Sequence, residues 1–389
     1  MSASNDLEES VVDDSRHGPV CEREDGVVFN DLTPQHKVLI PEFHRVLDEV
    51  ITSSQYVGGR HLEAFESEFA AYAGVRHCIG VGNGSDALEF ALRTVDVKGG
   101  EVIVPANSFV ATATSVIRAG GVPVFADVDD LTGLLSSASV EDRLSRRTRA
   151  VVLVHLYGQL APVETFVEAS DRFPVAVVED AAQAHGARRH GRHAGSFGAT
   201  AAMSFYPSKN LGALGDGGAV LTMSDEIALK IRRLRDYGAE HKNVHQVVGF
   251  NSRLDNLQAA FLSAKLRHLD RWNAARRQAA DYYTGQLSDV DGIRLPVVLE
   301  GNDHAWHLYV IRVEDRSSFM EKMVAHGIEV GCHYPFPIHL QPGFAYLGYT
   351  RGLVPVAERW ADQVVSLPLF PGITEGQQDR VVRAVVASR

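Results

Sequence analysis

Short runs of β-branched and apolar residues alternate with helix-like segments between residues 77 and 222, and this pattern limits the fold most strongly. Apolar residues recur at helical spacing over residues 61–73, 86–95 and 111–119, which predicts helices there. An α/β fold around a mostly parallel sheet follows from such alternation. Its seven strands are expected at residues 77–81, 101–105, 122–128, 150–156, 174–180, 200–205 and 218–222.

The pattern changes after about residue 251. Apolar residues on one face predict a long helix over 253–275, and the segment 252–255 has the form of a capping box at its start. A strand-like run at 306–313 and helices near 317–326 and 377–386 predict a second α+β domain. We therefore expect a flexible acidic tail (1–25), a large α/β domain (26–260) and a smaller C-terminal domain (261–389).

Composition excludes several classes of protein. The net charge of −11 disfavours binding to nucleic acid, which needs a clustered positive surface. The three cysteines, Cys21, Cys78 and Cys332, form no C-x-x-C pair, so free thiols in a reducing compartment are expected. The N-terminus lacks the order of a signal peptide, and no apolar stretch is long enough to span a membrane. A cytoplasmic protein without a membrane partner is predicted.

A glycine-rich turn follows the first predicted strand. Gly82 and Gly84 let the backbone approach a ligand, and the turn leads into a helix N-terminus, where anions bind. A dinucleotide fingerprint would need glycine where Ser85 stands, which disfavours a nicotinamide-dependent oxidoreductase. The Gly-Lys-Ser/Thr of a phosphate-loop NTPase is absent. An ordinary tight turn remains the alternative.

Three further candidates follow other strands. Phe109 could stack on a planar ligand or belong to the core. Asp180 ends a buried strand, where a carboxylate needs a cation or a strong donor, unless it only caps a helix. Lys209 lies in a glycine-rich loop, although most lysines are simply solvated. Together, a phosphate cup, an aromatic, a buried acid and a lysine at one sheet edge suit pyridoxal 5′-phosphate (PLP).

Two longer motifs carry a family resemblance. Residues 179–186 read Glu-Asp-Ala-Ala-Gln-Ala-His-Gly, and residues 204–212 read Ser-Phe-Tyr-Pro-Ser-Lys-Asn-Leu-Gly. With these motifs the chain resembles, over nearly its whole length after residue 26, the sugar-nucleotide aminotransferases of the DegT/DnrJ type. That resemblance implies the aspartate-aminotransferase-like fold of the fold-type I PLP enzymes.

The resemblance also implies roles for individual residues. Lys209 would bond covalently to the PLP aldehyde carbon and shuttle a proton, and Asp180 would pair with the ring nitrogen. Phe109 would stack on the ring, Gln183 would lie near its hydroxyl group, and Asn251 would reach the phosphate from the neighbouring subunit of an obligatory homodimer. Further cofactor contacts are expected from Gly84, Ser85, the backbone of Asp86, and Ser204.

The family pattern further implies the reaction. Glutamate would give its amino group, and a dTDP-linked keto-6-deoxyhexose would receive it in amino-sugar biosynthesis of the antibiotic type. Related dehydratases carry histidine where this chain has Lys209, which favours transamination. The stretches at 82–88 and 333–339 look most like enzymes that aminate carbon 3, with carbon 4 as the alternative. A non-catalytic PLP-binding regulator is a more remote one.

Substrate contacts are expected from Tyr157, His333, Tyr334 and His339. Cys332 with the two histidines could suggest a metal, but three such groups on a proline-rich loop are more simply explained as the wall of a pocket. No metal is therefore predicted.

Overall fold

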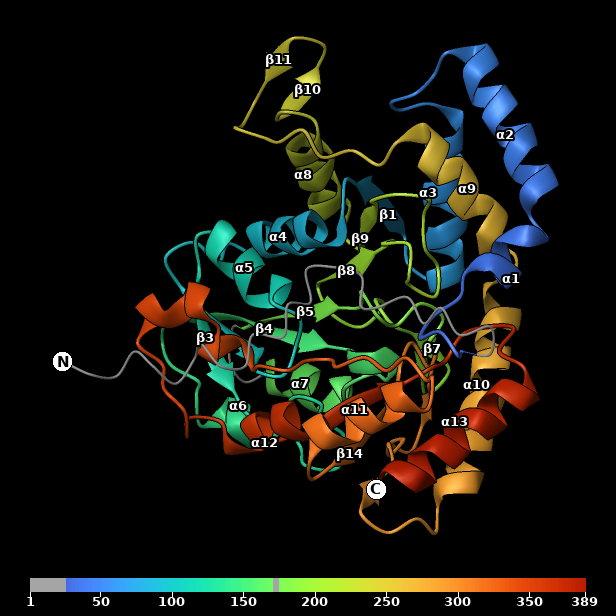
Figure 1. Cartoon of the computed structure of the whole chain (residues 1–389). Helices are drawn as coiled ribbons and strands as arrows, with labels where there is room; N and C mark the ends of the chain where they lie inside the picture. Colours follow the sequence, from blue (N-terminus) through green and yellow to red (C-terminus); the bar gives the residue numbers. More distant parts are fainter. Residues whose placement is uncertain (1–25, 171–174) are drawn as a thin grey trace.

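The computed structural model describes residues 26–170 and 175–389, so the predicted tail and Cys21 lie outside the described residues. A seven-stranded sheet forms the centre of the molecule (Figure 1). Its strands are β1 (His77–Val81), β2 (Glu101–Pro105), β3 (Val122–Ala126), β4 (Thr148–Val154), β5 (Ala176–Asp180), β8 (Thr200–Ser204) and β9 (Gly218–Thr222).

The strand order is β1-β9-β8-β5-β4-β2-β3. Only β9 runs antiparallel to its neighbours β1 and β8, and the other pairs in this sheet are parallel. The predicted α/β fold with a mostly parallel seven-stranded sheet is confirmed.

Alternation along each strand explains why both faces of this sheet are covered. In β2, Val102 and Val104 point into one apolar cluster, and Ile103 points into another. Because successive strand residues face opposite sides, a strand that is apolar at every position needs helices on both faces. One face carries α4 (Gly84–Thr94), α5 (Ala111–Arg118) and α8 (Asp225–Arg235); the other carries α3 (Arg60–Ala73), α6 (Ser137–Glu141) and α7 (Val163–Ser170) (Figure 1).

The predicted single helix over 253–275 is wrong. The chain forms α9 (Asn256–Leu266) and α10 (Leu269–Leu287), which are separated at Arg267 and His268. Leu266 and Leu269 flank this break and are both buried in one apolar cluster, and the segment contains no proline or glycine breaker. The predicted capping box is also replaced, because the Ser252 hydroxyl accepts from the Gly82 N–H at 3.0 Å.

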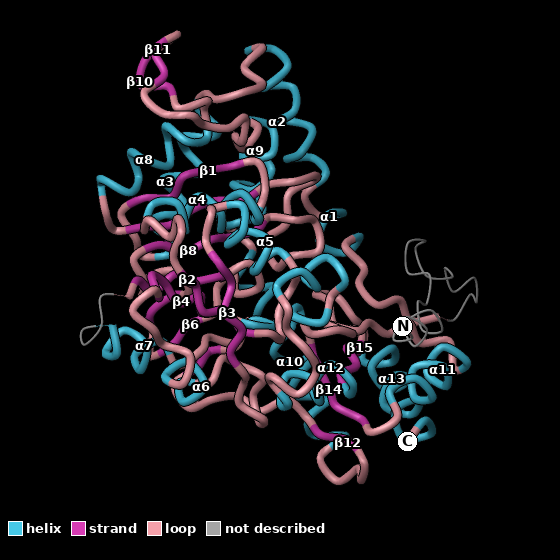
Figure 2. The backbone as a smooth tube through the Cα atoms, turned by 90° about the vertical axis from the view of Figure 1, so that its left-hand side faces the viewer, coloured by secondary structure: helices cyan, strands magenta, loops and turns pink. Residues whose placement is uncertain are grey.

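A second, antiparallel sheet lies at the opposite end from α2 in both views (Figures 1 and 2). Its strands are β12 (Ile293–Arg294), β14 (Tyr309–Val313) and β15 (Val364–Leu367), and its helices are α10, α11 (Arg316–Ala325) and α13 (Glu375–Ser388). Val27 packs in this C-terminal core and pairs with Ile328. Trp360 packs instead with the large sheet. The division into 26–260 and 261–389 stays a prediction.

The remaining elements connect or extend these two parts. The hairpin of β10 (Ala239–His241) and β11 (Val244–His245) projects at the same end of the molecule as α2 (Ile40–Ser53) (Figures 1 and 2). None of the helices in the described ranges is long and apolar enough to cross a membrane. The other short elements are α1 (Thr33–Lys37), α12 (Pro355–Gln363), β6 (Arg188–Arg189), β7 (Arg192–His193), β13 (Asn302–Asp303) and the 3₁₀ turns Leu156–Gly158, Ile338–Leu340 and Pro342–Leu347.

Candidate active site

A cavity of about 570 Å³ opens at the carboxyl ends of β4, β5 and β8. In parallel sheets this edge is where ligands bind, because the loops that follow the strands converge there. Nine of the residues predicted from the sequence line the cavity. They are Gly84, Ser85, Phe109, Asp180, Gln183, Ser204, Lys209, His333 and Tyr334.

The wall formed by the start of α4 is shaped to receive an anion. Asn83 caps this helix by accepting the Asp86 N–H at 2.9 Å, which leaves Gly84 and Ser85 at the first turn. A side chain at Gly84 would place its Cβ 2.5 Å from the Ser204 Cβ. The absence of that atom lets β8 approach the helix N-terminus. A phosphate group fits this cradle of N–H groups, hydroxyl groups and a helix dipole.

Asp180 ends β5 at the cavity and is buried. Its Oδ2 accepts from the Thr112 hydroxyl at 3.0 Å, and its Oδ1 accepts from the Ala182 N–H at 3.3 Å. Burial raises the pKa of Asp180, while these donors and the nearby Lys209 charge oppose that rise. A cationic ring nitrogen beside the carboxylate would compensate for its lost hydration, which is what a protonated pyridine ring offers.

Lys209 reaches the cavity from the loop after β8. Its Nζ lies 3.5 Å from Nε2 of His307. Burial lowers the pKa of Lys209 to about 8, although the Asp180 carboxylate opposes this shift. Burial lowers the pKa of a second lysine, Lys265, equally to about 8, but that amine donates to the Gly212 carbonyl oxygen. What distinguishes Lys209 is therefore its place on the cavity wall, since the lowered pKa is shared by both lysines.

Two aromatic side chains and an amide flank the space between Asp180 and the opening. Phe109 is 53% exposed, and its ring centroid lies 5.7 Å from that of Tyr334. Gln183 is held at both ends, since its Oε1 accepts from the Tyr157 N–H at 2.7 Å and its Nε2 donates to the Tyr334 hydroxyl at 2.9 Å. A flat ring can lie against Phe109 within this frame.

Four predicted site residues lie outside the cavity wall. The Asp86 N–H is engaged by Asn83, and its carboxylate pairs with Arg118 at 3.0 Å. Tyr157 lies behind the wall and donates its hydroxyl group to the His333 carbonyl oxygen. His339 is buried against Glu358 at 3.1 Å, so it supports the proline-rich loop from behind and is not placed for substrate contact.

The fourth is Asn251, which is exposed at the base of the β10–β11 hairpin. Its Oδ1 accepts from Nη2 of Arg253 at 2.6 Å. It does not reach the cavity of its own chain.

The structure adds three groups that the sequence reasoning missed. The Ser108 and Thr112 hydroxyl groups lie 2.8 Å apart, and Thr112 supports Asp180. His307 faces Lys209 across the cavity. Ser108 directly precedes the predicted Phe109 in the segment 105–109, whereas Thr112 and His307 belong to neither of the two longer motifs. Within the described ranges, no group of three or more His, Cys, Asp or Glu residues is arranged to hold a metal.

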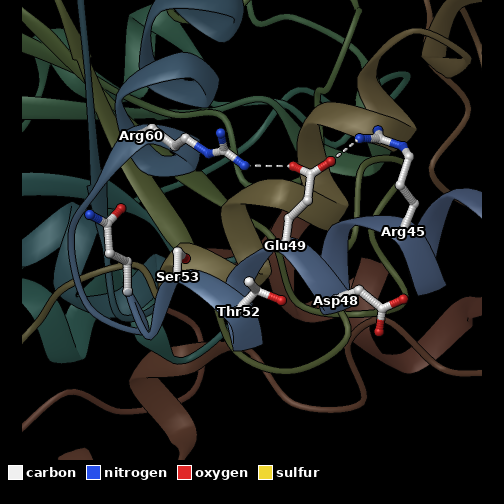
Figure 3. A pocket seen from close by; sticks show the side chains of 7 residues that line it. Arg45, Asp48, Glu49, Thr52, Ser53 and Arg60 are labelled. Atoms are coloured by element: carbon white, nitrogen blue, oxygen red, sulfur yellow. Dashed lines mark hydrogen bonds and ion pairs between the residues drawn. The ribbon is translucent and has the colours of Figure 1, made fainter.

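A second depression lies between α2 and the start of α3 and is lined by charged and polar side chains (Figure 3). Glu49 stands between Arg45 and Arg60, and its Oε2 lies 2.8 Å from Nη2 of Arg60. Both arginine side chains are more than half exposed. Such solvated pairs contribute little energy. This depression shows none of the buried, convergent groups found around Lys209.

Comparisons with known proteins agree with this geometry. A family model described as the DegT/DnrJ/EryC1/StrS aminotransferase family matches residues 38–386. A pleiotropic regulatory protein of Geobacillus stearothermophilus is 45% identical, over 91% of this chain and 96% of the relative. The dTDP-3-amino-3,4,6-trideoxy-alpha-D-glucose transaminase of Streptomyces venezuelae is 43% identical, over 92% of this chain and 95% of the relative. The crystal structure of S. venezuelae DesV superposes with a TM-score of 0.91 at 43% identity, covering 93% of this chain and 98% of DesV.

Fold and site thus define a fold-type I, PLP-dependent sugar aminotransferase. More particularly, the chain belongs to the DegT/DnrJ/EryC1/StrS aminotransferase family. The anion cradle at Gly84, the buried acid at Asp180 and the amine of Lys209 are the groups that fit the phosphate, the ring nitrogen and the aldehyde carbon of PLP.

The cradle gives a first prediction. Gly84→Ala should weaken PLP binding about tenfold or more, the order expected when a hydrogen bond to a charged group is lost, because the new methyl group collides with Ser204. Cofactor titration followed by absorbance measures this, alongside the melting temperature of the apoprotein. Gly285→Ala is the matched control, since a Cβ there meets no described atom within 4 Å. Unchanged affinity in a folded Gly84→Ala protein would contradict the assignment.

Proposed function

We propose that this protein transfers the amino group of glutamate to carbon 3 of a keto-6-deoxyhexose linked to dTDP, in a pathway that makes an amino sugar of the antibiotic type. The observation that carries the proposal is the meeting of Lys209, Asp180 and the Gly84–Ser85 cradle in one cavity. The name of the S. venezuelae transaminase, which places the nitrogen at carbon 3 of a dTDP sugar, supports the substrate class. A cytoplasmic location is part of the proposal, in keeping with the free thiol of Cys78.

PLP supplies an aldehyde carbon that bonds to amines and a ring that withdraws electrons from the bond being broken. The protein supplies the rest. The cradle at Ser85 and Ser204 would hold the phosphate, and Asp180, fixed by Thr112, would keep the ring nitrogen protonated. Nζ of Lys209 would accept the proton from the α-carbon of glutamate and, in the second half of the reaction, would give a proton to the sugar carbon that receives the nitrogen. His333 and Tyr334 line the same cavity and would contact the sugar there.

The attachment point is tested by borohydride reduction of the PLP-loaded protein, followed by peptide mapping. We expect the label on Lys209, and a loss of the near-visible band on adding glutamate. Lys265 is an internal control, because it is buried with a similarly lowered pKa but lies away from the cavity. A label at Lys265, or no label with ample cofactor, would remove Lys209 from its role.

The substrate position needs a separate assay. The protein is incubated with glutamate and with 3-keto or 4-keto dTDP-6-deoxyhexose, and NMR identifies the carbon that carries nitrogen. We expect a product aminated at carbon 3 that depends on Lys209. Nitrogen at carbon 4 would favour the alternative considered from the sequence, while leaving the aminotransferase class intact.

We also propose a homodimer with shared active sites. Asn251 is exposed outside the cavity of its own chain, at the base of a projecting hairpin that bears the exposed apolar side chains Val244, Val247 and Val248. A solvent-facing apolar patch of this kind is typical of an interface. In this arrangement Asn251 would reach the phosphate in the partner's cavity.

Mixing subunits tests this arrangement. Lys209→Ala and Asn251→Ala proteins are each expected to be impaired. A mixed dimer should regain activity, because one of its two sites receives both wild-type residues. Heterodimers are verified by differential tags before assay. Verified heterodimers with no more activity than either parent would show that each site is built from one chain.

The relative named a pleiotropic regulatory protein supports a second candidate function, that of a PLP-binding regulator. Such a protein would bind PLP at Lys209 without turning over glutamate. The labelling experiment distinguishes the two, since the regulator would carry the label but keep its near-visible band when glutamate is added.

A further inference from the structure

We propose that His307 is a positioning residue that accepts a hydrogen bond from the Lys209 amine, and that two buried amides fix the imidazole in the tautomer this requires. The proposal rests on the role proposed above for Lys209. Its starting point is geometric, because Nε2 of His307 lies 3.5 Å from Nζ of Lys209 at the cavity wall, where His307 is buried and Lys209 is half-buried.

The tautomer follows from a chain of hydrogen bonds that begins at a backbone carbonyl. The His185 carbonyl oxygen can only accept, so the group that faces it at 2.8 Å must be the NH₂ of Asn273. The Oδ1 of Asn273 therefore faces Asn210. The NH₂ of Asn210 donates to this oxygen and to the Ala305 carbonyl oxygen, each at 2.8 Å.

The second amide passes this orientation to the imidazole. With both N–H bonds of Asn210 directed at acceptors, its Oδ1 is the atom that lies 3.2 Å from Nδ1 of His307. An oxygen there needs a donor, so Nδ1 carries the hydrogen. In a neutral imidazole the lone pair is then on Nε2, the atom that faces Lys209.

The surroundings keep this imidazole neutral. Burial, together with the charges of Lys209 and Arg276, holds the pKa of His307 well below its ordinary value. The titratable groups around Lys209 are Asp180 at the end of β5, His185 in the following turn, His307 before β14, and His333 in the proline-rich loop. Asp180 supplies the opposing charge, and His307 supplies a neutral acceptor.

The acceptor on His307 would orient Lys209 whenever this lysine is not bonded to the cofactor. A free amine on a flexible stem has many orientations, and proton transfer needs its lone pair aimed at the reacting carbon. A hydrogen bond from Nζ to Nε2 of His307 occupies one N–H and fixes the side chain. His307 itself gains and loses no proton.

Two variants distinguish the role of His307 as a hydrogen-bond acceptor from a role in packing alone. His307→Gln can place a carbonyl oxygen near the position of Nε2, whereas His307→Asn keeps a donor near Nδ1 but has no acceptor that reaches Lys209. Because a hydrogen bond to the charged form favours that form, His307→Asn should lower the pKa of Lys209 below its value of about 8, and His307→Gln should retain it.

The measurement uses apoprotein and needs no substrate. Trace labelling with trinitrobenzenesulfonate over a pH series, followed by peptide mapping, reports the titration of each lysine. Lys265 is the internal control and should titrate alike in all three proteins. In the PLP-loaded protein, single turnover with glutamate should be about tenfold slower in His307→Asn, the order expected for one lost hydrogen bond to a charged group, with a larger isotope effect from α-deuterated glutamate.

The outcomes distinguish this proposal from the proposed function. Identical titration of Lys209 in the wild type and in His307→Asn overturns the proposal. An equal fall of the Lys209 pKa in both variants, together with a lowered melting temperature, also overturns it, because that result indicates a purely structural histidine. If His307→Asn does not fold, His307→Ala with added imidazole replaces it, and no recovery of Lys209 titration by imidazole overturns the proposal. Failure of borohydride to label Lys209 would refute the function while leaving the titration result standing.

Discussion

The burial of a carboxylate and an amine at one edge of the sheet is the constraint on which this active site depends. Burial disfavours the charged forms of both Asp180 and Lys209, and the two pKa values shift in the directions that burial dictates. Each charge partly stabilises the other, yet the side chain nearest to each charged group is neutral. Thr112 donates to Asp180, and His307 faces Lys209.

A second buried pair anchors the strand that carries the acid. Glu179, one residue before Asp180, faces the opposite side of the sheet and bonds to Nε2 of His155 at 2.8 Å. It also accepts the N–H groups of Gly195, Phe197 and Gly198. Burial alone would raise the pKa of Glu179, but His155 and these N–H groups hold it below its ordinary value. The Asp180 carbonyl oxygen accepts the His155 N–H at 3.0 Å, so this network fixes the strand end from behind.

Local patterns predicted much of this arrangement because each strand and the loop that follows it are contiguous in the sequence. Asp180 could be found because it ends a buried strand, and Lys209 because it lies in the glycine-rich loop after one. Gly84 could be found because a glycine-rich turn has a composition of its own. Residues that act through partners far away in the sequence have no such local pattern. His307 comes just before β14 and meets Lys209 only because the second part of the chain folds back over the sheet edge.

The break after α9 also escaped prediction. Leu266 and Leu269 on its two sides are both apolar and buried in one cluster, so the apolar pattern continues through the break and gives no sign of it. His339 gives the converse case. Its motif resembles a substrate loop, but its partner Glu358 on α12 holds it behind the loop. For His339 a contact with a residue on another element decided the outcome, and periodicity carries no information about such contacts.

The two buried lysines show why a shifted pKa by itself does not identify a reactive group. Lys209 and Lys265 have the same lowered pKa, and burial is the leading cause for both. Lys265 ends at a single backbone carbonyl within a packed layer, where an incoming carbon atom has no space. Lys209 ends in a cavity, opposite an acceptor whose lone pair is set by a chain of amides leading back to a main-chain oxygen. Reactivity here depends on free space and orientation as much as on the free-amine fraction, and the fold provides both only at the carboxyl edge of the sheet.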